Sequence, residues 1–206
     1  MFTDRREAGE HLAEVLRGRL SSDALVLGVP RGGVVVAAEV ARALGLELDV
    51  VVVRKIGAPA NPEYAIGAVD EDGEVIGGAE AAVDPGYVQR AAEEGRAEIV
   101  RRLAAYRGDR PRARIRGREV VIVDDGIATG MTLRAAVESL KRRGASRVLI
   151  AAPVAAAESV RMLREVADEV VVPEMPARFW AVGQHYRRFD QTTDTEVIGL
   201  LQDAWR

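Results

Sequence analysis

The sequence contains no cysteine, carries no large excess of charge and has no long hydrophobic run. Without cysteine, disulfide bonds, thiolate nucleophiles and cysteine-based zinc sites are excluded. The longest apolar runs, at residues 24–30 and 50–53, are far too short to span a bilayer, and the charged residues 1–16 lack the apolar segment of a signal peptide. A formal net charge of −3 provides no strong attraction to nucleic acids or membranes. We therefore expect a soluble cytoplasmic protein without a membrane partner, and we do not favour a nucleic-acid partner.

Apolar runs and helical periodicities alternate along the chain. Runs rich in β-branched residues predict strands at residues 24–29, 48–54, 119–123, 148–152 and 169–172. Helical spacing predicts helices capped by Asp4 or Thr3, at residues 34–44, 88–107, 130–143 and 156–166, and after a cap at Asp194 or Thr195. A hairpin is predicted around Asp72 and Gly73. The alternation predicts a doubly wound α/β fold, with a central parallel sheet and helices on both faces. Ligands bind such sheets at the carboxyl ends of the strands.

The most informative segment is the strand-to-helix turn VIVDDGIATGMT at residues 121–132. Its apolar strand ends in two adjacent carboxylates, Asp124 and Asp125, and its turn leads into a helix whose N-terminus can bind an anion of phosphate size. Close backbone approach and hydroxyl donors are available at Gly126, Gly130, Thr129 and Thr132. Two carboxylates would repel a ligand that is only an anion. They suit a ligand that also offers neutral donors, such as the two hydroxyls of a ribose, with a divalent cation to offset the charge.

This segment resembles the phosphoribosyl pyrophosphate motif of type I phosphoribosyltransferases. That motif is an apolar strand, two acids, two variable residues and a small-residue turn ending in Thr-Gly-x-Thr. The resemblance implies that Asp124 and Asp125 hold the 2- and 3-hydroxyls of the ribose. It also implies that the turn holds the 5-phosphate, at Gly126, Ile127, Ala128, Thr129, Gly130 and Thr132. Two further stretches, RKIGAPANPEYAIGAV and FWAVGQHYRRFDQTTDTEV, resemble a bacterial branch of predicted phosphoribosyltransferases.

The turn after the first strand occupies the place where the family has a short pyrophosphate-binding loop, often with a strained cis peptide before a basic residue. The resemblance implies that Arg31 supplies the charge here, and that Gly32 and Gly33 supply backbone donors. Lys55 or the neighbouring Arg54, at the end of the second predicted strand, would add a third contact to the pyrophosphate.

The resemblance implies transfer of a phosphoribosyl group from phosphoribosyl pyrophosphate to a nitrogen acceptor, with a nucleobase as the first candidate. Catalysis is assigned to Asp124, Asp125 and Arg31, through positioning, neutralisation of the leaving group and exclusion of water around an oxocarbenium-like state. Mg²⁺ is implied on the pyrophosphate, with Asp124 and Asp125 nearby, through water or the ligand. Ala128 stands where members that use 6-oxopurines have an aspartate, so a hypoxanthine-guanine substrate is not favoured.

Residues 1–172 are expected to form the phosphoribosyltransferase-like core, with a flexible loop or hairpin at about 56–80 and an inserted helix at about 88–107. Residues 173–206 are expected to form a small C-terminal hood over the acceptor. In that hood, Phe179 and Trp180 are candidates to stack on a planar acceptor.

A second interpretation is a regulator that senses phosphoribosyl pyrophosphate without turning it over and contacts nucleic acid. The retained pyrophosphate loop favours the enzyme, and the sequence shows no added DNA-binding domain. A Rossmann dehydrogenase is excluded, because no GxGxxG motif follows the first predicted strand. The oligomeric state stays open, with a homodimer as one alternative.

Overall fold

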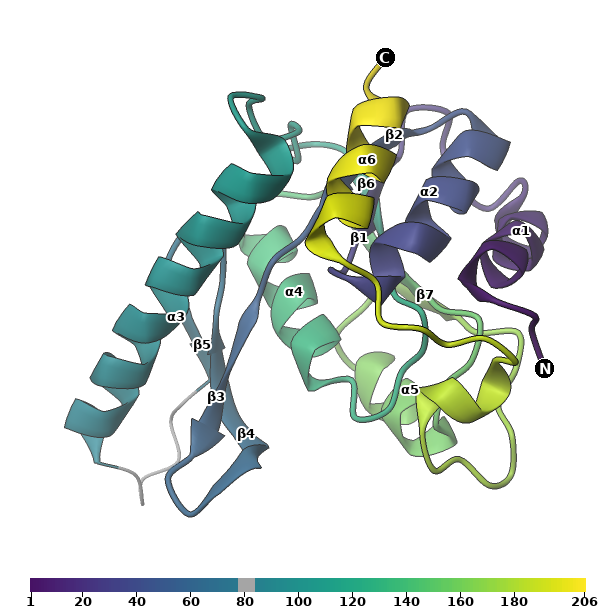
Figure 1. Cartoon of the computed structure of the whole chain (residues 1–206). Helices are drawn as coiled ribbons and strands as arrows, with labels where there is room; N and C mark the ends of the chain where they lie inside the picture. Colours follow the sequence, from purple (N-terminus) through teal and green to yellow (C-terminus); the bar gives the residue numbers. More distant parts are fainter. Residues whose placement is uncertain (78–83) are drawn as a thin grey trace.

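Two sheets, one parallel and one antiparallel, organise the chain in the computed structural model, which describes residues 1–77 and 84–206 and only the backbone of residues 62–64. The strands are β1 (Leu25–Gly28), β2 (Glu47–Val50), β3 (Arg54–Ala58), β4 (Asn61–Val69), β5 (Val75–Gly77), β6 (Glu119–Val123), β7 (Arg147–Ala151) and β8 (Glu169–Val171). The helices are α1 (Arg5–Leu16), α2 (Gly32–Leu44), α3 (Pro85–Arg107), α4 (Met131–Arg142), α5 (Ala157–Leu163) and α6 (Asp194–Ala204), with the short 3-10 helix η1 (Val182–His185). Figure 1 shows helices around the parallel sheet and, beside it, an arm made of β3, β4, β5 and α3.

The central sheet is parallel throughout, in the order β2-β1-β6-β7-β8. Alternate residues of each strand point to opposite faces of the sheet. Val26 and Val121 pack in one cluster with α1, α2 and α6, whereas Leu27 and Ile122 pack in a second cluster with α4 and α5. The predicted doubly wound α/β fold is therefore confirmed.

The strand order reverses between β1 and β6. From β1 the chain moves outward to β2, and after the arm it returns to β6 and proceeds to the other side of the sheet. In open α/β sheets, such a switch point opens a crevice at the carboxyl ends of the two strands. The two turns predicted to bind ligand are the ones that follow β1 and β6.

The predicted strand at residues 48–54 is wrong in its extent. β2 ends at Val50, and Arg54 already begins β3 in the antiparallel sheet. Val51 and Val52 between them are buried, so the apolar run continues although the chain has left one sheet for the other. The Val52 N–H donates to the carboxylate of Glu71 over 2.9 Å rather than to a neighbouring strand. An apolar run by itself does not mark such a change of sheet.

The predicted hairpin around Asp72 and Gly73 is confirmed and joins β4 to β5. Gly73 has a left-handed φ of 79°, which glycine adopts without steric cost. One carboxylate oxygen of Asp70 accepts hydrogen bonds from the N–H groups of Asp72, over 3.0 Å, and Glu74, over 2.9 Å. A further hairpin joins β3 to β4 and was not predicted. Of the hairpin region expected at about 56–80, residues 78–80 lie outside the described residues.

A buried network of charges fixes the arm to the core. The guanidinium of Arg107, at the end of α3, donates to Asp49 of β2 over 2.8 Å and to Glu71 over 3.1 Å. Asp70 accepts from the hydroxyl of Ser139 on α4 over 2.7 Å. Removing one partner of a buried ion pair costs about 3–5 kcal/mol, because the other charge stays buried. The base of the arm is therefore held firmly beside the carboxyl edge of β2.

The C-terminal helix α6 returns to the core. Its cap is Thr193, whose hydroxyl accepts a backbone hydrogen bond, so the predicted caps Asp194 and Thr195 are displaced by one or two positions. The buried side chains of α6 belong to the same cluster as those of α2. A hood over the carboxyl edge would therefore comprise the segment before α6, and the division of the chain at residue 172 stays a prediction.

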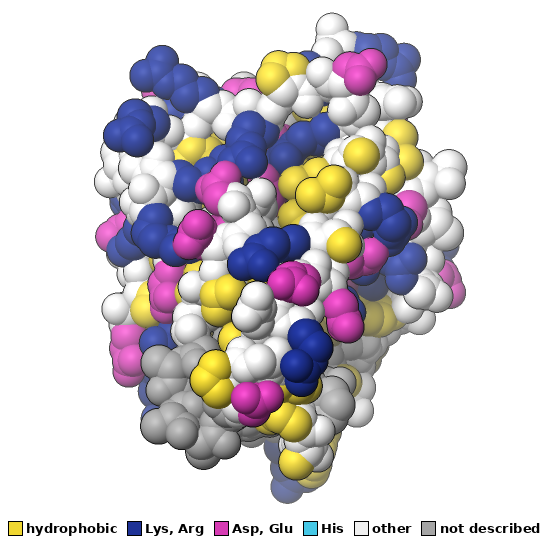
Figure 2. All heavy atoms as spheres, turned by 90° about the vertical axis from the view of Figure 1, so that its left-hand side faces the viewer, with side chains coloured by type: hydrophobic (Ala, Val, Ile, Leu, Met, Phe, Trp, Pro, Cys, Tyr) yellow, Lys and Arg dark blue, Asp and Glu magenta, His cyan; other side chains and the backbone are white. Residues whose placement is uncertain are grey.

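The outer face of the arm carries charges of both signs. Figure 2 shows this face, where basic and acidic side chains are interspersed over α3. Many of them form pairs along the helix, such as Glu98 with Arg101 and Arg102. Among the described residues, no helix combines the length and the apolar character needed to cross a membrane.

Candidate functional site

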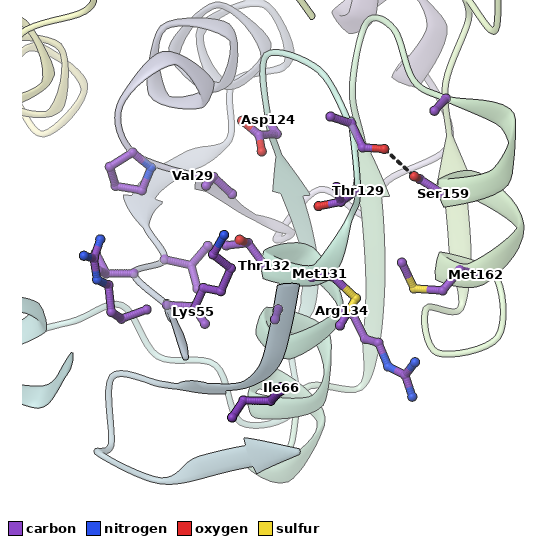
Figure 3. Close-up of a pocket in the computed structure, with 18 of the residues that line it drawn as sticks. Val29, Lys55, Ile66, Asp124, Thr129, Met131, Thr132, Arg134, Ser159 and Met162 are labelled. Atoms are coloured by element: carbon purple, nitrogen blue, oxygen red, sulfur yellow. Dashed lines mark hydrogen bonds between the residues drawn. The ribbon is translucent and has the colours of Figure 1, made fainter. Parts of the chain in front are cut away.

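A large cavity opens at the carboxyl edge of the central sheet, beside the switch point (Figure 3). Its volume is about 1020 Å³. Residues at the ends of β1, β2 and β6 line it, as do residues of the arm and of the first turns of α4 and α5. Pockets of roughly 300–1,000 Å³ enclose most of a drug-sized ligand, so this cavity has room for a sugar phosphate and a second reactant.

The turn between β6 and α4 forms one wall of the cavity. α4 begins after Gly130, whose φ of 72° is left-handed, and no side chain caps its first turn. The first N–H groups of a helix have no partner within it, so this turn offers backbone donors to an anion. Thr129 and Thr132 lie at the cavity wall beside these donors (Figure 3), and Ala128 also lines it.

The loop before α5 braces this turn from behind. The N–H of Ile127 donates to the Val154 carbonyl over 3.0 Å, and the Ile127 carbonyl accepts from the N–H of Ala156 over 2.9 Å. The hydroxyl of Ser159 donates to the carbonyl of Ala128 (Figure 3). Because the side chain of Ile127 is also buried, this residue holds the turn in place. Its position does not support the predicted contact with a phosphate.

The two adjacent carboxylates, Asp124 and Asp125, lie in different surroundings. Asp124 lines the cavity, whereas Asp125 is not among the lining residues and accepts a hydrogen bond from Nε of Arg5, on α1, over 2.7 Å. Burial, reinforced by the charge of Asp125, raises the pKa of Asp124 well above its ordinary value. Burial also raises the pKa of Asp125, and the hydrogen bond from Arg5 opposes that rise. Asp124 is therefore the carboxylate that a ligand in the cavity meets.

The turn between β1 and α2 lies across the switch point. The peptide bond between Pro30 and Arg31 is cis, as the resemblance led us to expect, and α2 begins at Gly32 without a side-chain cap. Gly33 lies so close to β6 that an added Cβ would stand 2.8 Å from a carbonyl oxygen at the end of that strand. Pro30 lines the large cavity, whereas Arg31 and Gly32 line a neighbouring hollow of about 360 Å³ together with Arg5.

Among the described side chains, cations outnumber acids around the large cavity. The lining cations are Arg54, Lys55, Arg102 and Arg134, and the lining acids are Asp124 and Glu158. Arg102 comes from α3, where it pairs with Glu98 over 2.6 Å. Arg134, on α4, pairs with Glu138 over 3.2 Å. No local pattern in the sequence pointed to Arg102, because only the packing of α3 against β3 brings it to the cavity. An excess of cations suits a ligand that carries several negative charges.

The predicted acceptor residues do not line the cavity. The ring of Phe179 stacks on His185, with the ring centroids 5.3 Å apart, and Trp180 is 80% exposed. The segment that carries them nevertheless reaches the turn after β6, since a Cβ added to Gly126 would collide with the side chain of Val182. The segment therefore covers that turn on a side different from the cavity mouth.

Asp124 is the residue best placed to face a metal ion. Among the described residues, no cluster of three or more His, Asp or Glu side chains is arranged to hold a metal. Mg²⁺ usually keeps several waters and binds one or two carboxylates together with ligand phosphates. Asp124, at the cavity wall, would be the carboxylate that faces an ion held mainly by the ligand.

Known proteins resemble this chain both in sequence and in structure. The model of the phosphoribosyl transferase domain family matches residues 4–187. The crystal structure of TT1426 from Thermus thermophilus has a TM-score of 0.89 and 47% sequence identity, over 98% of each chain. Two Mycobacterium tuberculosis proteins, MT0597 and Rv0571c, are provisionally named phosphoribosyl transferases and are 43% identical over 212 residues. The match covers 100% of this chain and 47% of theirs, so the chain spans about half the length of these curated relatives.

Proposed function

The chain belongs to the phosphoribosyl transferase domain family, and we propose that it transfers the phosphoribosyl group of 5-phosphoribosyl 1-pyrophosphate to a nitrogen acceptor. The observation that carries the proposal is the pair of uncapped helix starts, at α2 and α4, on either side of the switch point. Each can bind an anion, and the carboxylate of Asp124 lies between them: it lines the cavity beside α4 and would stand 2.9 Å from a Cβ added to Gly33 of α2. A ligand with phosphates at both ends and sugar hydroxyls between them matches this arrangement.

The 5-phosphate is assigned to the start of α4. The N–H groups of its first turn and the hydroxyls of Thr129 and Thr132 are the donors available there. Gly130 keeps the backbone open to close approach of a phosphate. The carboxylate of Asp124 would accept hydrogen bonds from the ribose hydroxyls, which an anion alone could not donate.

The pyrophosphate is assigned to the start of α2. Arg31 and the N–H groups that follow it are the donors, and Lys55 and Arg102 at the cavity wall add positive charge. When bound, Mg²⁺ would neutralise charge on the pyrophosphate, with Asp124 as the carboxylate facing it. These groups would stabilise the leaving group as the bond between C1 and the pyrophosphate oxygen breaks.

The reaction then needs only an acceptor nitrogen beside C1. A bond forms between that nitrogen and C1, pyrophosphate departs with the electrons of the broken bond, and the acceptor loses a proton. We assign the acceptor to a planar nucleobase that reaches C1 from the large cavity. Trp180, whose ring is exposed, is the better candidate for stacking, which contributes about 1–3 kcal/mol per base in comparable sites. Because Trp180 does not line the cavity, stacking requires the segment before α6 to move toward the base. Phe179 is already stacked on His185.

Binding is tested first, by the melting temperature in the presence of phosphoribosyl pyrophosphate and Mg²⁺. A ligand that binds only the folded state raises the melting temperature by mass action, so we expect a rise that grows with ligand concentration. The absence of any rise at millimolar ligand would contradict the proposal. Ribose 5-phosphate should give a smaller rise, because it lacks the pyrophosphate.

Turnover is tested by pyrophosphate release with a panel of nucleobases. We expect release with at least one base, and little with hypoxanthine or guanine, since Ala128 replaces the aspartate that 6-oxopurine members carry. For the active base, Trp180→Ala should raise the KM at least several-fold and leave the affinity for phosphoribosyl pyrophosphate unchanged. Binding without release for every base would favour a regulator that senses the ligand.

A further inference from the structure

Arg5, on the first turn of α1, joins four segments of the chain at the base of the proposed site. We propose that Arg5 is a positioning residue for the phosphoribosyl ligand: it anchors Asp125, so that the turn after β6 presents Asp124 to the ribose. This inference rests on the proposed function, because the ligand it concerns is the one assigned there. The sequence motif assigns both carboxylates to the ribose and gives Arg5 no role.

The guanidinium of Arg5 is held on three sides. Its Nε donates to Oδ2 of Asp125 over 2.7 Å, and only 12% of the Arg5 side chain and 15% of the Asp125 side chain are exposed. A second nitrogen donates to the backbone carbonyl of Asp190 over 2.8 Å. The ring of Phe189 lies 3.9 Å from the guanidinium carbon, in cation–π contact. An exposed ion pair contributes little to the free energy of unfolding, but this ion pair is shielded from solvent and its direction is fixed by its other contacts.

The pair also contacts the start of α2. A Cβ added to Gly32 would collide with Oδ2 of Asp125 and would stand 2.7 Å from Nε of Arg5. The backbone of the pyrophosphate turn therefore rests directly on the ion pair. Any rotation of the Asp125 side chain would displace the backbone at Gly32. This contact couples the two ends of the ligand site.

The segment before α6 contacts the turn after β6 from the other side. The phenol of Tyr186 donates to the backbone carbonyl of Asp125 over 2.6 Å, and Val182 packs against Gly126. Asp125 is thus held through both its carboxylate and its carbonyl, by residues from opposite ends of the chain. The family match begins at residue 4 and ends at residue 187, so it spans both of these contacts.

Arg5 also changes the charge balance of the two carboxylates. The groups that face Asp125 are Asp124, Arg5 and the phenol of Tyr186, with Arg31 across the neighbouring hollow. Without Arg5, two buried carboxylates would stand side by side with less positive charge near them. Their mutual repulsion would then shift the turn and change the direction in which Asp124 is presented to the ribose.

Two other roles of Arg5 would change the ligand affinity differently when Arg5 is removed. If Arg5 withheld Asp125 from the ribose, removing Arg5 would free a second carboxylate and strengthen binding. If the pair served folding alone, removing it would lower the melting temperature and leave the affinity of the folded protein unchanged. The affinity of the folded protein and its melting temperature therefore separate the three roles.

The test compares Arg5→Met with Arg6→Met, each titrated calorimetrically with ribose 5-phosphate and with phosphoribosyl pyrophosphate plus Mg²⁺. Arg6 is a matched control: it lies on the same helix turn and pairs with Glu39 over 3.2 Å, but its side chain is 58% exposed. We expect Arg5→Met to weaken both ligands by about tenfold, the loss of a well-placed charged hydrogen bond, and Arg6→Met to change neither more than about twofold.

Arg5→Lys keeps the test decisive if Arg5→Met does not fold. Lysine retains the charge but not the fork that reaches both Asp125 and Asp190, so we expect an affinity between those of the parent and of Arg5→Met. Parental affinity in Arg5→Lys, or unchanged or tighter binding in folded Arg5→Met, would overturn the positioning role. If the parent binds neither ligand, the proposed function itself fails, and this inference fails with it.

Discussion

The turns after β1 and β6 leave neighbouring strands of one sheet, and both run into a helix that has no side-chain cap. The turn after β1 is short and carries Arg31. The turn after β6 is longer and begins with two carboxylates, Asp124 and Asp125. The first is held by Gly33, which packs against the end of β6, whereas the second is braced by hydrogen bonds from the loop before α5, from Arg5 and from Tyr186.

The difference matches what each turn is proposed to hold. A pyrophosphate needs only positive charge and backbone donors, which a short turn with an arginine supplies. A ribose phosphate needs donors for its phosphate and acceptors for its hydroxyls, so the second turn must keep carboxylates close to an anion. Burial raises the pKa values of both carboxylates, and the extra bracing holds that unfavourable arrangement in place.

Gly33→Ala should have the largest effect, because it forces the two turns apart. The new Cβ would stand 2.8 Å from a backbone oxygen and 2.9 Å from the Cα of Asp124, and backbone atoms cannot rotate away. We expect a loss of about 1–3 kcal/mol in the free energy of unfolding, as for other overpacked sites, and loss of detectable phosphoribosyl pyrophosphate binding. Urea denaturation and calorimetry measure the two effects.

Gly199→Ala is the control for this change. Gly199 lies within α6, and an added Cβ would meet nothing within 4 Å. Alanine in place of glycine within a helix should raise the free energy of unfolding by roughly 0.5–1 kcal/mol, with no change in ligand affinity. Equal behaviour of the two variants would show that the turns are not packed as described.

Asp124→Asn should separate ligand binding from stability. The amide can still accept the N–H of Asp125, which now donates to Oδ1 of Asp124 over 2.9 Å. It is a weaker acceptor for ribose hydroxyls than a carboxylate, so we expect ribose 5-phosphate to bind about tenfold or more weakly. Calorimetry with ribose 5-phosphate measures this loss.

The same variant should be more stable than the parent at neutral pH. The pKa of Asp124 is higher in the folded state than in the unfolded state, so its ionisation disfavours folding as the pH rises above the unfolded value. The advantage of Asp124→Asn should therefore disappear at low pH, where the carboxyl is neutral in both states. A variant less stable than the parent at neutral pH would contradict the burial of this charge.

Arg102→Ala should have the smallest effect on ligand affinity. It tests whether the pyrophosphate site extends to α3. Arg101 and Arg102 both pair with Glu98, but only Arg102 lines the cavity. We expect Arg102→Ala to weaken phosphoribosyl pyrophosphate by about fivefold, less than a fully buried contact would, because the side chain stays partly solvated. Arg101→Ala should leave the affinity unchanged, and equal losses in both variants would place the effect in α3 as a whole.

Local sequence signals were sufficient for the central sheet and for the turns that leave it. The strand at residues 119–123 was predicted with its observed bounds, because a buried parallel strand is a continuous run of β-branched residues. The hairpin at Gly73 followed from its turn residues. The motif at residues 121–132 identified Asp124 and the threonines that line the cavity.

Contacts between distant parts of the chain were beyond the reach of the sequence. Arg5 meets Asp125 120 positions along the chain, and no spacing rule connects them. Arg102 reaches the cavity only through the packing of α3. The change of sheet between Val50 and Arg54 lies within one apolar run. In each case, the contact depends on the tertiary structure, which local sequence patterns do not reveal.

The central claim is that the two turns divide phosphoribosyl pyrophosphate between them, with the pyrophosphate at Arg31 and the ribose 5-phosphate at the turn after β6. The most direct test is calorimetric titration of the parent and of Arg31→Ala with phosphoribosyl pyrophosphate, pyrophosphate and ribose 5-phosphate, all with Mg²⁺. We expect Arg31→Ala to lose about 1.5–3 kcal/mol of binding free energy for the two ligands that contain pyrophosphate, and almost none for ribose 5-phosphate. Equal losses for pyrophosphate and ribose 5-phosphate, or an unchanged affinity for all three ligands, would contradict the division.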